Sequence, residues 1–137
     1  MLKLISSVLF IFIFGIFIYG LSLRGSLGNP TIETITYDAG TPFESSHERS
    51  PYALLINLYE NKSFVLQPEW AEIAAPDVGI HNGQFYSFFP PGVPMLILPF
   101  YHFGYKFQLG QLASYATIPL FSIGSMICIL LVSRLVF

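Results

Sequence analysis

Four side chains suited to acid–base and phosphate chemistry stand close together in this sequence: Glu44, His47, Glu48 and Arg49. A carboxylate can act as a general base on a hydroxyl group, and an arginine can clamp a phosphate through two parallel N–H bonds. The same residues also suit a solvated loop with a surface ion pair, since acids are favoured at the start of a helix. The cluster by itself leaves both interpretations open.

Asp77 is a further acidic candidate, and it follows Pro76 directly. Its carboxylate suits general-base chemistry, and it equally suits a turn in which the side chain bonds the nearby backbone. The three histidines are far apart in the sequence, and no cluster of His and Cys has the spacing of a metal site. A glycine-rich phosphate loop and a nucleophile elbow are also absent from the sequence. We therefore expect no metal site, and the sequence leaves any cofactor open.

These polar residues lie between two long apolar runs. The stretches Leu4–Leu23 and Leu112–Ser133 contain no charged residue, and about 20 apolar residues are enough for a helix that crosses a bilayer. The chain is 53% hydrophobic and only 10% charged, whereas a soluble domain carries about a quarter charged residues. The sequence therefore predicts an all-α polytopic membrane protein with transmembrane helices at residues 1–27 and 112–137.

A cleaved signal peptide is the alternative for the first apolar run. That run is longer than the usual ~7–15 residues of a signal core, and no A-x-A-like cleavage site follows it, so we favour an uncleaved helix. Lys3 precedes the first run and Arg134 closes the second. Because cytoplasmic flanks are enriched in Lys and Arg, we expect both termini inside and residues 28–91 as an extracytoplasmic loop.

All eight acidic residues lie in this loop, between Glu33 and Asp77. Such a loop does not attract nucleic acid or anionic headgroups through its bulk charge. The partners that the sequence indicates are therefore membrane lipids through the apolar runs, and no nucleic acid. The protein is expected in the cell membrane as a multi-pass chain.

Within the loop, Ser50 and Pro51 are typical of a helix start, as N-cap and first helical residue. The helix is expected to reach Asn61, and its apolar residues recur at helical spacing. That apolar face consists of Tyr52, Leu55, Ile56 and Tyr59. It could pack on the protein or lie on lipid. The sequence thus predicts a juxtamembrane helix in the loop.

A short hairpin is predicted further along the loop. Asn82 and Gly83 separate two runs that suit strands, residues 78–81 and 84–87, and Asn-Gly favours the positive φ angles of a two-residue turn. Residues 64–66 form a third strand-like run.

The apolar stretch at residues 92–108 admits two interpretations. It is short for a membrane span and contains Pro94 and Pro99, which favours a kinked interfacial or re-entrant helix. A full span is the alternative, and it would place Arg134 on the outer side, against the distribution of positive charge. We expect the interfacial or re-entrant helix.

The order of these pieces resembles the start of the GT-C glycosyltransferases of the family 39 type, which include protein O-mannosyltransferases and lipid A aminoarabinose transferases. The resemblance rests on YALLINLYENKSF, PDVGIHNGQFYS and FFPPGVPMLILPFYHFG. In that group an acidic motif follows the first span, and a helix beginning around Tyr-Ala, a glycine-containing turn and a double-proline corner come next. Tyr52-Ala53 and Pro90-Pro91 fall in this order here.

The resemblance implies that this chain is the amino-terminal part of a membrane enzyme. Such an enzyme moves a sugar from a polyprenyl-phosphate donor to a hydroxyl acceptor by inverting displacement. Glu48 stands where the family carries its acidic motif, so it is the first candidate for the catalytic base, with Glu44 and Asp77 behind it. Arg49 is the candidate for binding the lipid phosphate. The rival expectation is a small non-enzymatic membrane protein whose loop binds a partner.

Overall fold

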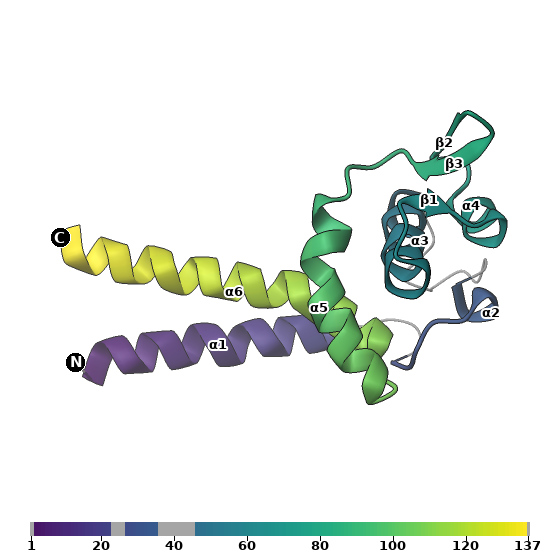
Figure 1. The fold of residues 1–137 in the computed structure, drawn as a ribbon. Coiled ribbons are helices and arrows are strands. Elements are labelled where there is room, and N and C mark those ends of the chain that lie inside the picture. Colours follow the sequence, from purple (N-terminus) through teal and green to yellow (C-terminus); the bar gives the residue numbers. More distant parts are fainter. Residues whose placement is uncertain (1, 23–26, 36–45, 137) are drawn as a thin grey trace. The chain divides into compact units, whose positions relative to one another are not determined.

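The polar loop and the apolar runs belong to different parts of the molecule. A computed structural model describes residues 2–22, 27–35 and 46–136, which are mostly helical with one small sheet (Figure 1). The chain divides into two compact units. One unit comprises residues 1–23 and 115–137, and the other comprises residues 24–114.

Two apolar helices form the first unit: α1 (Leu2–Ser22) and α6 (Gly110–Val136), whose first residues belong to the second unit. Both are long and apolar enough to cross a membrane, as the sequence predicts. Most of their large apolar side chains are exposed, a surface that suits lipid rather than water. The two helices approach closely at Gly15, where a Cβ would lie 2.6 Å from the Ile123 side chain. Small residues permit such close packing of apolar helices.

The central helix of the second unit is α3 (Ser46–Asn61). Residues 52–58 are all buried, and both α4 (Pro68–Ala74) and α5 (Gly92–Lys106) contact this helix. The apolar face predicted for α3 therefore packs on protein, and burial extends well beyond that face.

The predicted start of this helix is wrong by one turn. The helix begins at Ser46, so Ser50 and Pro51 lie inside it. The Ser50 hydroxyl donates to the Asp77 carbonyl instead of capping the helix. Pro51 has no N–H for the His47 carbonyl one turn earlier. The additional turn places three residues of the predicted cluster, His47, Glu48 and Arg49, on helical backbone.

The predicted hairpin is confirmed. It joins β2 (Val78–His81) to β3 (Gln84–Ser87) through Asn82 and Gly83, whose φ angles are +51° and +74°. The strand-like run contributes β1 (Val65–Leu66), which pairs antiparallel with β3 and gives the order β1-β3-β2. The description as all-α is therefore corrected to a mostly helical fold with a small three-stranded sheet.

Two helices of the second unit were not expected from the sequence: α2 (Ile32–Ile35) and α4. In α4 a proline stands at the first helical position, and Trp70, Ile73 and Ala74 are buried. Proline at the first position and apolar residues at this spacing are signals of a helix. Residues 64–66 were predicted as a strand, and the helix that begins two residues later was not predicted.

The helix predicted at residues 92–108 is α5, which has 15 residues and contains Pro99. At about 1.5 Å per residue it is about 22 Å long, which is short of the ~30 Å hydrocarbon core of a bilayer. Among the residues that the structure describes, only α1 and α6 qualify as candidate membrane spans. The position of α5 relative to a membrane stays a prediction.

Candidate functional site

The backbone carbonyl of Asp77 accepts two hydrogen bonds from other parts of the chain. The buried Ser50 hydroxyl on α3 and the Phe88 N–H after β3 both donate to the Asp77 carbonyl, at 2.9 and 3.0 Å. Ser50 also shares a 2.9 Å hydrogen bond with the Ser87 hydroxyl. The start of α3, the α4–β2 connection and the end of β3 therefore meet at one corner of the second unit.

The Asp77 side chain faces His47 at this corner. The distance from Asp77 Oδ2 to His47 Nδ1 is 3.7 Å, which is longer than a hydrogen bond but within the range of an ion pair. The Oδ2 atom is buried and accepts no hydrogen bond from the described residues. The His47 imidazole lies within ion-pair distance of this atom. The hydrogen bonds from Ser50 and Phe88 go to the backbone carbonyl of Asp77 and not to its carboxylate.

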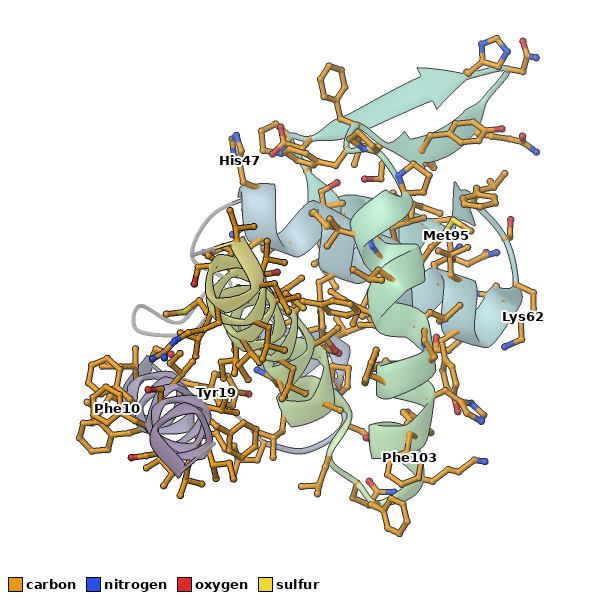
Figure 2. The ribbon with its side chains drawn as sticks, turned by 90° about the vertical axis from the view of Figure 1, so that its left-hand side faces the viewer. Phe10, Tyr19, His47, Lys62, Met95 and Phe103 are labelled. Carbon is orange, nitrogen blue, oxygen red and sulfur yellow. The ribbon has the colours of Figure 1, made fainter. Side chains whose placement is uncertain are left out.

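His47 itself is open to solvent. Its side chain is 75% exposed, and it stands at the amino end of α3, at the opposite end from Lys62 (Figure 2). The Phe89 ring lies 5.2 Å from the imidazole, centroid to centroid. The imidazole thus lies near both a carboxylate and an aromatic ring while most of its surface faces water.

Arg49 has a structural role in this corner. Its Nε–H donates to the Ile73 carbonyl at 3.1 Å, and Nη2 donates to the Ala75 carbonyl at 3.4 Å. These carbonyls lie at the carboxyl end of α4, where a positive charge is stabilised by the helix dipole. Arg49 therefore ties α3 to α4, and phosphate binding by this residue stays a prediction.

The other two acidic candidates are Glu48 and Glu44. Glu48 is exposed in the first turn of α3, where the partial positive charge of the helix end favours a carboxylate. Glu44 lies outside the described residues. The structure thus brings Glu48, Arg49 and Asp77 to one corner, together with His47.

Sequence reasoning named His47 but assigned it no role, and it missed the contribution of Ser87. No local sequence pattern indicates these contacts. The residues that Ser50 bonds, Asp77 and Ser87, lie 27 and 37 positions further along the chain. Among the described residues, no group of three or more His, Cys, Asp and Glu side chains could hold a metal ion.

An exposed imidazole backed by a carboxylate is suited to proton transfer. In such pairs the carboxylate orients the ring and leaves the other ring nitrogen open to a reacting group. A charge-assisted hydrogen bond between His47 and Asp77 would require the 3.7 Å contact to shorten by about 1 Å, a tightening common on substrate binding. The corner could therefore remove a proton from a hydroxyl group brought to His47.

Comparison of the chain with models of protein families, with curated protein sequences and with solved structures finds no match. The resemblance to the GT-C glycosyltransferases therefore rests on the motifs quoted above. The geometry of this corner is a separate basis for assigning a function.

Proposed function

We propose that this chain is part of a membrane glycosyltransferase that moves a sugar from a polyprenyl-phosphate donor to a hydroxyl acceptor. The observation that carries the proposal is the pairing of exposed His47 with the Asp77 carboxylate. The order of motifs that resembles the GT-C enzymes supports the same reaction. In this proposal α1 and α6 cross the membrane, and both termini are cytoplasmic because Lys3 and Arg134 flank the spans. The second unit then works at the extracytoplasmic surface.

In the proposed reaction, His47 accepts the proton of the acceptor hydroxyl. The hydroxyl oxygen attacks the anomeric carbon, the bond from that carbon to the phosphate oxygen breaks, and the lipid phosphate leaves with inversion. Asp77 orients the imidazole and stabilises its positive charge. This assignment puts His47 in the role that sequence reasoning gave first to Glu48, since Asp77 supports His47 directly.

Two features supply positive charge for the departing phosphate. The amino end of α3 carries a partial positive charge, and Arg49 lies one turn inside it. Charge held in place before the reaction stabilises a leaving anion more than mobile solvent does. Arg49→Lys keeps a charge but loses the fork that reaches two carbonyls. A raised KM for the donor with unchanged protease resistance would support the phosphate role.

The test is sugar transfer in membranes that contain the protein, with a panel of polyprenyl-phosphate sugars as donors. Asp77→Asn is the sharpest variant, because Ser50 and Phe88 bond the Asp77 backbone carbonyl, which the substitution leaves in place. We expect Asp77→Asn and His47→Gln each to lower the transfer rate by about 10²-fold or more. Glu72→Gln, an exposed acid on α4, is the matched control and should leave the rate unchanged.

Near-normal transfer by both Asp77→Asn and His47→Gln would remove the pair from the mechanism, and Glu48→Gln would then be the next variant. Failure of every donor in the panel would contradict the transferase itself. The partner-binding loop would then be the better explanation, and cross-linking from exposed positions such as Glu72 would be the way to find the partner.

A further inference from the structure

One face of α5 is apolar and exposed. Its side chains recur at intervals of three or four residues and cover about 80° of the helix circumference, at 3.6 residues per turn. They are between 39% and 66% exposed. This apolar face consists of Val93, Leu96, Phe100, Phe103 and Phe107. Figure 2 labels Phe103 on this helix, and its ring contacts Phe107 at 5.1 Å.

The opposite side of α5 is occupied by protein. Tyr101 is fully buried, and its ring makes edge contacts with Tyr52 and Tyr59 of α3 at 6.5 and 5.1 Å. One face of α5 thus packs against α3, and the apolar face is exposed. No other described segment of the second unit buries the apolar face, as its exposure shows.

Between these two faces α5 carries polar side chains, the exposed His102 and Lys106. Lys106 lies in the last turn of the helix. Long basic side chains beside aromatic rings are typical of the boundary between lipid and water, where the stem lies on apolar surface and the ammonium reaches phosphate groups.

Hydrogen bonds place the end of α5 beside the start of an apolar helix. Asn29 donates to the Tyr105 carbonyl of α5 at 3.0 Å and accepts from the Gly110 N–H, the first residue of α6, at 3.0 Å. The Gln111 N–H donates to the Gly28 carbonyl at 3.0 Å. Gly28 follows α1 by only a few residues. The carboxyl end of α5 is thus held beside the first residues of α6.

Apolar side chains are also exposed in the short connection from α5 to α6, on either side of the exposed Gln108. Phe107 is 61% exposed and Leu109 is 40% exposed, and α6 begins at the next residue. α6 has 27 residues, or about 40 Å of helix, which exceeds the ~30 Å hydrocarbon core. A helix of this length that crosses a bilayer therefore extends beyond the hydrocarbon core.

We propose that the apolar face of α5 inserts into the lipid of the same membrane that α6 enters, with Lys106 at the headgroup phosphates. The lipid is favoured over a second protein chain because the short connection to α6 keeps this face at the membrane boundary. The proposal requires α6 to enter a bilayer, but it does not depend on sugar transfer.

The test must be local, because α1 and α6 would hold the protein in a membrane whatever α5 does. Cys128 is replaced by serine, and single cysteines are spin-labelled at Phe100 and Phe103 on the apolar face. His102 on the same helix and Glu72 on α4 are the matched controls, since both are exposed. The protein is reconstituted in vesicles of phosphatidylcholine and phosphatidylglycerol. Collision rates are then measured with oxygen, which concentrates in lipid, and with a nickel chelate, which stays in water.

We expect oxygen to dominate at Phe100 and Phe103, and the nickel chelate to dominate at His102 and Glu72. A nickel accessibility at Phe103 equal to that at Glu72 would overturn the proposal, because the face would then lie in water. Immobilised labels that neither reagent reaches would also overturn it, because a second copy or another protein segment would then cover the face. The readout needs no enzyme activity, so its failure is distinct from failure of the proposed transferase.

Discussion

At the residue scale, Asn57 organises the end of α3 and the start of the sheet. Its side chain is fully buried. The amide nitrogen donates to the Ser63 and Val65 carbonyls at 2.7 and 2.9 Å, and the amide oxygen accepts from the Gln67 N–H at 3.2 Å. Asn61 adds a further donor to that oxygen. The Asn57 side-chain amide therefore supplies hydrogen-bond partners to three backbone groups between the end of α3 and the start of α4.

Replacing Asn57 by alanine should lower the free energy of unfolding of the second unit by about 3 kcal/mol, because partly buried backbone groups lose their partners. Protease resistance of the protein in detergent would measure the loss. Asn61→Ala is the control, since Asn61 is exposed and contributes one bond to this network. Equal losses from the two variants would contradict the central role of Asn57.

Two buried tyrosines make stability depend on alkaline pH. Burial raises the pKa of Tyr101 above its usual value, and nearby charge on Tyr52 and Glu60 raises it further. Burial also raises the pKa of Tyr52, against a smaller opposite effect from the nearby Ser114 hydroxyl. The unfolded chain ionises these hydroxyls near pH ~10. Above that pH the unfolded state binds fewer protons than the folded state, so stability falls as pH rises.

The Tyr101→Phe protein should therefore lose less free energy of unfolding than the unmodified protein as the pH rises above about 10. Below about pH 9 the free energy of unfolding should change with pH by nearly the same amount in both proteins. Unfolding in denaturant across this pH range would measure both slopes. An unchanged alkaline slope in Tyr101→Phe would show that Tyr101 is not the group that titrates.

At the element scale, α5 and α6 meet at a tight corner. Gly104 is buried near the end of α5, and a Cβ there would lie 2.8 Å from the Leu109 carbonyl oxygen and would also collide with the Ala113 side chain. Gln108, between the helices, has a φ of +59°, which is uncommon for a residue with a side chain. The corner therefore requires glycine at position 104, and it includes an uncommon positive φ angle at Gln108.

Gly104→Ala should destabilise the second unit by about 2 kcal/mol, because backbone atoms cannot move aside as a flexible side chain would. Gly92→Ala, at the start of the same helix, is the matched control, since nothing lies within 4 Å of its added Cβ. Thermal unfolding followed by circular dichroism would compare them. A Gly104→Ala protein as stable as the Gly92→Ala protein would mean that the corner opens easily.

At the scale of the whole molecule, the proposed topology predicts that the second unit and the ends of the chain lie on opposite sides of the membrane. With Cys128 replaced by serine, a cysteine at exposed Asn61 should react with an impermeant reagent in intact cells. A cysteine at Leu135, near the end of α6, should react only after permeabilisation. The reverse pattern would invert the topology, and reaction of both in intact cells would mean that one apolar helix does not cross.

The sequence by itself determined the elements whose signals are local. Two uncharged runs of about 20 residues, long enough to cross the hydrocarbon core of a bilayer, predicted α1 and α6. Asn82-Gly83 predicted the hairpin, because these residues readily adopt positive φ at two successive positions. The helical spacing from Tyr52 to Tyr59 predicted α3, though not its first turn. Ser50 is a residue type that commonly caps a helix, but its hydroxyl donates to the distant Asp77 carbonyl instead.

Only the tertiary structure decided which polar residues meet. Asn29 bonds a carbonyl 76 positions away, and Arg49 caps a helix that lies 24 positions further along the chain. His47 lies beside Asp77 because the turn that carries Asp77 is bonded to Ser50 of the same helix. Such contacts depend on the path of the chain between the partners, and local residue preferences carry little information about that path.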